Sequence, residues 1–130
     1  MKTNVYLICA DVEGEKLHKI GFTRRKVETR LKEFRTANAS DLYLVDSFKS
    51  EWGTKIEASL HRIFKQKKVR GEWFHLSEKD IKAFKDYCQT LHDNFEFIKE
   101  HNTYYIDTQK NVNLFKFILY KKETNYGLLS

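Results

Sequence analysis

Two β-type runs joined by a polar turn open the chain and constrain its fold most strongly. Residues 4–10 and 17–23 are short, largely apolar and rich in β-branched and aromatic side chains, and a mainly polar segment separates them. Runs of this kind around a turn are typical of a β-hairpin. With the turn centred on residues 13–14, Tyr6 lies opposite Gly21.

This register sorts the hairpin into two faces, because side chains alternate along a strand. On one face Lys19 lies opposite Ile8 and is a diagonal neighbour of Tyr6. Gly21 leaves open space opposite the tyrosine. A one-residue slip would place Lys19 among apolar side chains, so we expect the stated register. The other face is apolar throughout: Val5, Leu7, Cys9, Ile20 and Phe22.

Helical and strand patterns alternate after the hairpin. Apolar residues three and four apart predict a helix over residues 26–36 and another from residue 54. A strand is expected over residues 41–50, a basic turn over 65–71, and a short strand or extended segment over 72–76. The predicted fold class is therefore α+β, a small three-stranded antiparallel sheet flanked by helices. The helical stripes are Val27, Leu31 and Phe34, then Ile56, Leu60, Ile63 and Phe64.

The C-terminal part contains one long helix and a β-like tail. Ser77 and Asp80 have the spacing of a capping box, and the apolar period predicts an amphipathic helix over residues 78–100. We expect one domain over residues 1–100, in which this helix covers the sheet. Residues 101–130 form an extension with the pattern of a β-hairpin. The pattern leaves open whether it extends the sheet, pairs two chains or binds a protein partner.

Length and composition exclude several classes of protein. With 130 residues, 41% of them hydrophobic, the chain is long enough for one domain with a core and too short for two. No apolar run suits a membrane span, and the N-terminus lacks the apolar segment of a signal peptide. Cys9 and Cys88 lie in apolar patterns, so we expect buried free thiols in a reducing cytosol.

The formal charge of +6 is concentrated in one part of the chain. Residues 1–76 hold 16 Lys and Arg against 10 Asp and Glu, whereas residues 77–130 hold eight of each. An excess confined to one region indicates a surface that faces a polyanion, although ordinary solubilising charge also explains an excess of this size. The candidate phosphate contacts are Arg24, Arg25, Lys26, Lys65, Lys67, Lys68 and Arg70.

Glu57 and His61 lie four residues apart on the second helix, beside its apolar stripe. A lone carboxylate at the edge of a buried face usually points into solvent, so this pair alone indicates no site. Trp73 and Phe74, in the segment that follows, favour core packing over base stacking.

Five short motifs, taken in order, resemble the GIY-YIG endonuclease superfamily. The resemblance covers roughly residues 4–77 and is nearest to a phage-type branch whose second motif reads Lys-Ile-Gly-x-Thr. The motifs are Val-Tyr-Leu-Ile at 5–8, Lys-Ile-Gly-Phe-Thr at 19–23, Arg-Leu at 30–31, Glu-x-x-Leu-His at 57–61 and Gly-Glu-Trp-Phe at 71–74.

The resemblance implies a catalytic site of five residues. Tyr6 corresponds to the tyrosine of the first motif, and Lys19 to the first position of the second motif. Arg30 corresponds to the helix arginine and Glu57 to the metal-binding glutamate, while His61 matches the branch pattern.

Two positions depart from the family pattern. Asn4-Val5 replaces the Gly-Ile of the first motif, and Phe34 stands where some members carry a histidine one turn after the arginine.

The implied chemistry is hydrolysis of a phosphodiester with Mg²⁺ or Mn²⁺ bound by Glu57, since Mg²⁺ needs few protein carboxylates and keeps most of its waters. Arg30 clamps phosphate oxygens where charge grows in the transition state. Tyr6 accepts the proton of the attacking water, and the Lys19 cation or the metal is expected to lower its pKa. His61 orients the metal waters or relays a proton.

Three functions follow from these patterns. The first is a metal-dependent DNA endonuclease or nickase in the cytoplasm of a bacterium or a phage-infected cell. The second is a non-catalytic DNA-binding or regulatory module on the same scaffold, which accounts for the altered first motif. The third is a phage-type interaction factor that forms a homodimer or binds a protein partner through residues 103–120.

Taken singly, each candidate site residue also has a purely structural interpretation. Tyr6 is then a packing residue of an edge strand, and the others are surface residues: Lys19, Arg30 and His61.

Overall fold

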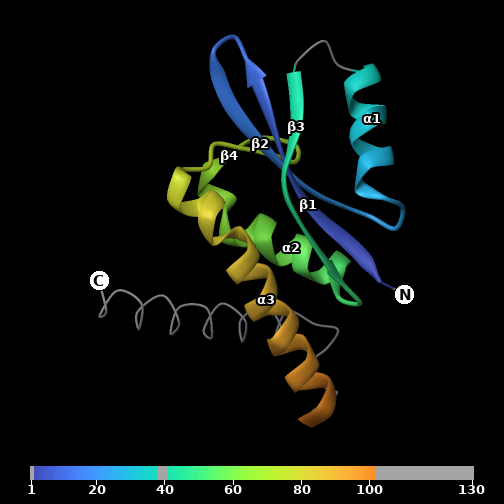
Figure 1. Cartoon of the computed structure of the whole chain (residues 1–130). Helices are drawn as coiled ribbons and strands as arrows, with labels where there is room; N and C mark the ends of the chain where they lie inside the picture. Colours follow the sequence, from blue (N-terminus) through green and yellow to red (C-terminus); the bar gives the residue numbers. More distant parts are fainter. Residues whose placement is uncertain (1, 38–40, 102–130) are drawn as a thin grey trace. The chain divides into compact units, whose positions relative to one another are not determined.

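An antiparallel sheet organises the part of the chain that the structure describes (Figure 1). The computed structural model describes residues 2–37 and 41–101, and the predicted β-like tail lies outside them. The strand order is β3-β1-β2-β5-β4. The elements are β1 (Thr3–Val12), β2 (Glu15–Thr23), α1 (Val27–Ala37), β3 (Asp41–Ser50), α2 (Gly53–Ile63), the 3₁₀ turn η1 (Lys65–Lys67), β4 (Lys68–Arg70), β5 (Trp73–Phe74) and α3 (Glu78–His101).

The predicted α+β class is confirmed, but the sheet within the described residues has five strands rather than three. The additional strands are three and two residues long. β5 lies within residues 72–76, where a short strand or extended segment was expected, whereas β4 is too short for an alternating pattern to indicate it. β4 falls inside the segment predicted as a basic turn. β5 pairs with β2 through His18 opposite Phe74 and Lys19 opposite Trp73, so tertiary pairing rather than local sequence determines these strands.

The predicted hairpin register is confirmed. Tyr6 pairs with Gly21 and Ile8 pairs with Lys19 along β1 and β2. The turn consists of Glu13 and Gly14, with φ angles of 53° and 83°. Positive φ at both central residues matches the right-handed twist of the two strands.

β1 is an interior strand of the sheet, with β2 on one side and β3 on the other. Its side chains from residue 5 to residue 10 are at most 2% exposed, so both of its faces are buried. The face of Tyr6 and Ile8 packs against Val27 and Leu31 of α1. The interpretation of Tyr6 as an edge-strand residue is therefore wrong. Phe22, expected in the apolar face, is 36% exposed, because it lies near the end of β2.

The two helices of the N-terminal half bury the predicted apolar stripes. Val27 and Leu31 of α1 are buried, and so are Ile56 and Leu60 of α2. α2 packs against β1 and β2. Gly53 begins α2 in close contact with β1, because a Cβ there would lie 2.6 Å from the Cβ of Thr3.

The predicted capping box begins α3. The Ser77 amide donates to Asp80 Oδ2 at 3.0 Å, and the Asp80 amide donates to Ser77 Oγ at 3.2 Å. Lys67 adds an ion pair to the same carboxylate. These bonds satisfy amide groups that a helix N-terminus leaves without partners.

The boundary between two compact units, residues 1–88 and 89–130, falls within α3. The first unit contains the sheet, α1, α2 and the start of α3, and the described residues of the second, 89–101, are helical. The division at residue 100 stays a prediction. None of the described helices is long and apolar enough to cross a membrane. Cys9 and Cys88 are buried free thiols, as predicted.

Candidate functional site

Tyr6 lies flat against the backbone of β2 at Gly21. A Cβ on Gly21 would lie 2.6 Å from Tyr6 Cζ and closer still to the hydroxyl. The space that the sequence predicted beside Gly21 is therefore present, and the tyrosine ring itself fills it. Tyr6 is 1% exposed, and its hydroxyl forms a hydrogen bond with Arg30 of α1.

The expectation of a lowered tyrosine pKa is wrong for the free protein. Burial raises the pKa of Tyr6, and the charges of Glu72 and Glu57 raise it further, while the hydrogen bond and charge of Arg30 oppose these effects. Lys19, the expected cation, pairs instead with Glu72 at 3.1 Å. Tyr6 is consequently a neutral phenol near neutral pH.

Lys19 lies in a largely enclosed position on β2, with 15% of its side chain exposed. Besides its ion pair with Glu72, its Nζ lies 4.3 Å from the ring centre of Phe34 and 5.7 Å from that of Trp73. Trp73 is half-buried against the core, and it reaches Lys19 because β5 pairs with β2 at that residue. Aromatic faces attract a nearby ammonium group, so this environment holds the lysine charge in one place.

The aromatic ring of Phe34 lies beside three of the candidate residues. Besides Lys19, the guanidinium carbon of Arg30 lies 4.4 Å from its centre. The ring of Tyr6 is 6.2 Å away, centre to centre, and tilted by 59°. Sequence reasoning placed Phe34 in the core stripe of the helix and did not give it this role.

Glu57 and His61 form the part of the site that α2 contributes. His61 Nε2 lies 2.8 Å from Glu57 Oε1 and also 2.8 Å from the carbonyl oxygen of Ile20. The Glu57 side chain is 14% exposed and that of His61 is 20% exposed, so the pair is mostly enclosed. The ring of Phe74 meets the His61 ring edge to face at 4.9 Å.

Burial, the largest single effect, lowers the pKa of His61, but its hydrogen bonds to Glu57 and to Ile20 and the charges of Glu57 and Glu72 outweigh burial and raise it. A raised pKa favours the doubly protonated imidazole, which donates from Nε2 to the carboxylate. His61 therefore holds Glu57 in a fixed position against β2.

The two halves of the site meet at neighbouring residues of β2. His61 binds the carbonyl of Ile20, and the Tyr6 ring covers Gly21, the next residue. The charge of Glu57 contributes, as the smallest effect, to the raised pKa of Tyr6. Tyr6, Lys19 and Arg30 thus lie beside the ring of Phe34, whereas Glu57 pairs with His61, which binds β2 at Ile20.

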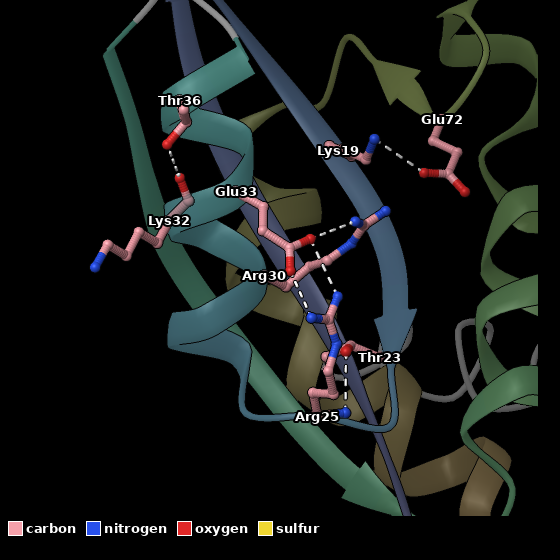
Figure 2. A network of polar contacts seen from close by, with 8 residues as sticks. All are labelled: Lys19, Thr23, Arg25, Arg30, Lys32, Glu33, Thr36 and Glu72. Carbon is pink, nitrogen blue, oxygen red and sulfur yellow. Dashed lines mark hydrogen bonds and ion pairs between the residues drawn. The ribbon is translucent and has the colours of Figure 1, made fainter.

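Arg30 also belongs to a surface network (Figure 2). Its Nη1 lies 3.0 Å from Glu33 Oε2, one turn further along α1, and Arg25 reaches the same carboxylate. The hydrogen bond that Arg30 donates to Glu33 is the main reason why the pKa of Arg30 is raised. The i, i+3 spacing of arginine and glutamate was visible in the sequence, whereas the approach of Arg25 depends on the loop before α1.

The predicted phosphate contacts fall into two separate groups. Arg24, Arg25 and Lys26 are exposed in the loop before α1, and Arg24 lies 5.9 Å from the exposed ring of Phe22. The second group lies on η1 and β4. Lys67 of this group pairs with Asp80, and the other three residues are exposed: Lys65, Lys68 and Arg70.

A metal ion at this site would depend on few protein ligands. Within residues 2–37 and 41–101, no group of three or more His, Cys, Asp or Glu is placed to hold a metal. Glu57 nevertheless fits Mg²⁺ or Mn²⁺ as a single, enclosed and fixed carboxylate, because Mg²⁺ commonly binds one or two carboxylates, substrate phosphates and water.

The fold and the site define a small α+β domain in which Tyr6, Lys19 and Arg30 lie beside the ring of Phe34. The model of the T5orf172 domain matches residues 4–89, so the chain belongs to this family, a nuclease-associated class of phage proteins. No curated protein and no solved structure matches the chain.

Proposed function

We propose that the protein is a metal-dependent DNA endonuclease or nickase of the GIY-YIG type, which hydrolyses phosphodiester bonds. The observation that supports this proposal is that Tyr6, bonded to Arg30, covers Gly21 of β2, while His61, which pairs with Glu57, binds the carbonyl of the preceding residue, Ile20. Membership of a nuclease-associated family supports it. Packing alone does not account for one acid, one phenol and two cations in a shared, mostly enclosed place.

Each side chain has a role that its environment supports. Arg30 binds phosphate oxygens through its guanidinium fork, and Lys19 adds a second fixed positive charge. The neutral hydroxyl of Tyr6 orients the attacking water by hydrogen bonding. His61 keeps the Glu57 carboxylate in place, and Glu57 would hold Mg²⁺ or Mn²⁺. The ion, when bound, supplies Lewis-acid stabilisation of the phosphate and of the leaving oxygen.

Conversion of supercoiled plasmid to nicked or linear DNA, followed on agarose gels with Mg²⁺ or Mn²⁺, tests this proposal. Glu57→Gln keeps the shape of the side chain and removes its charge, and we expect the rate to fall by about 100-fold or more. Glu28→Gln, an exposed position on α1, is the matched control and should cut at the rate of the unchanged protein. A folded protein that leaves supercoiled DNA intact with either ion would contradict the proposal.

The second candidate is a non-catalytic DNA-binding module on the same scaffold. The enclosed Tyr6, with its raised pKa, and the pairing of Lys19 with Glu72 favour it, since both features reduce the availability of reactive groups. Gel shifts would then show salt-dependent binding that is unchanged by Glu57→Gln. No nicking would occur under any metal condition.

A further inference from the structure

Two arginines converge on one carboxylate beside the start of α1 (Figure 2). Arg25 Nη2 lies 3.1 Å and Arg30 Nη1 lies 3.0 Å from Glu33 Oε2, and Arg25 Nη1 also pairs with Glu33 Oε1. Arg25 therefore engages both carboxylate oxygens with its guanidinium fork. A phosphodiester presents a similar pair of anionic oxygens, and paired arginines bind both kinds of group in this manner.

Both backbone polar groups of Arg25, its amide and its carbonyl, are hydrogen-bonded to side chains. Its amide donates to Thr23 Oγ1 at 3.1 Å, and its carbonyl accepts from Asn4 Nδ2 at 3.4 Å. Asn4 and Thr23 are paired residues of β1 and β2, so the loop is attached to the sheet. Asn4, which departs from the glycine of the first motif, thus has a structural role in placing Arg25.

We infer that Arg25 and Arg30 together form a binding site for one phosphodiester group of the DNA backbone, and that Glu33 occupies this site in the free protein. The inference rests on the proposed function for its ligand and adds a second arginine to the one assigned above. The three side chains are 57%, 37% and 41% exposed, respectively. Solvent screens their attraction, so an incoming phosphate displaces the carboxylate readily.

Fluorescence anisotropy with a labelled short duplex, in EDTA to prevent cleavage, measures the effect of Glu33. We expect Glu33→Gln to tighten binding by about three- to fivefold, because it removes the internal competitor. Glu28→Gln removes the same charge from an exposed position of the same helix and should change affinity by less than about twofold.

Double variants show whether the gain depends on the arginine pair. With Arg25→Gln in the background, Glu33→Gln should give no gain, because the released site has lost an arginine. With Arg24→Gln in the background, the gain should remain, because Arg24 lies beside the ring of Phe22, while Glu33 pairs with Arg25 and Arg30. Circular dichroism confirms that each variant is folded.

Three results would overturn the inference: equal gains from Glu33→Gln and Glu28→Gln, a gain that persists with Arg25→Gln, or weaker binding by Glu33→Gln. A protein that binds no duplex at about 50 mM salt would overturn it too. The binding assay contains no divalent ion, so it tests the inference separately from cleavage. A protein that shows these binding dependences but cuts no DNA with Mg²⁺ or Mn²⁺ would contradict the proposed nuclease and would support the inference.

Discussion

Tyr6 is the residue at which packing and chemistry depend on each other. Its ring fills the core on the α1 side of the sheet, and its hydroxyl reaches Arg30. This arrangement requires that the facing residue of β2, Gly21, has no side chain. A glycine in a strand interior costs stability, and it commonly marks a place where another group approaches the backbone closely.

Gly21→Ala should destabilise the protein by about 1–3 kcal/mol, because the added methyl group overlaps the Tyr6 ring. In a Tyr6→Ala background the same substitution should cost much less, since the new methyl group then enters the space left by the ring. Urea unfolding of the four proteins measures both values. Equal costs in the two backgrounds would show that the contact with Tyr6 is not the cause.

Phe34→Leu should lower the rate of DNA cleavage by about tenfold while the protein stays folded, because leucine offers no aromatic face to Lys19 and Arg30. Phe34→Tyr should retain most of the rate, since the ring remains. The lysine side-chain methylene resonances provide a separate check by NMR, because the ring of Phe34 shifts those of Lys19 upfield.

Phe22→Leu is the matched control for this prediction. It removes an aromatic ring that lies near Arg24, outside the site, and it should leave the rate within about twofold. Equal losses of rate in the two leucine variants would argue against a specific role for Phe34.

Among the elements, α3 has the most clearly defined start. Burial, the largest single effect, raises the pKa of Asp80, but the bonds from Lys67 and Ser77 outweigh it and lower the pKa below its ordinary value. The ionised carboxylate therefore stabilises the folded state. This contribution is complete above the ordinary pKa of aspartate and is lost as the pH falls through the lowered value.

Asp80→Asn should reduce the free energy of unfolding by about 1 kcal/mol at pH 7, because a neutral side chain makes a weaker cap and a weaker bond with Lys67. The difference between the two proteins should shrink as the pH is lowered towards about 3 or less. Urea unfolding of both proteins at several pH values measures it. A difference that is independent of pH would exclude the carboxylate charge as its source.

Local elements of the fold were predictable because their determinants lie close together in the sequence. The hairpin register follows from alternation and from a turn of two residues, Glu13 and Gly14. The capping box follows from two residues three apart. Strand β5 lies in the segment expected to be a short strand or extended, but its pairing with β2 was not predicted, and β4 was not predicted at all, because a few residues carry no period and a pairing partner far away in the chain leaves no local signal.

For the site, the sequence supplied the residue types but not their partners. The five motifs predicted that Tyr6, Arg30 and Glu57 belong to one site. The pairing of Lys19 with Glu72 depends on β5, which brings that segment beside β2. Burial of both faces of β1, which raises the pKa of Tyr6, is a property of the assembled layers and has no local pattern.

At the scale of the whole molecule, stability can be changed far from the site. Glu13 has a positive φ of 53° at the exposed tip of the hairpin, a conformation that asparagine and glycine adopt more easily. Glu13→Asn should raise the melting temperature by a few degrees, about what a gain of 0.5–1 kcal/mol produces in a domain of this size. Differential scanning calorimetry measures the change, and plasmid cleavage should be unaltered.

The interior position of β1 in the sheet has a consequence for the genetics of such a protein. Because each side chain from residue 5 to residue 10 supports the interior of the sheet, random changes there should mostly yield chains that cellular proteases remove before any activity can be assayed. Inactive but abundant alleles should instead arise at exposed or half-exposed positions such as Arg30 and Arg25. A survey that records both protein abundance and activity would separate these two groups of alleles.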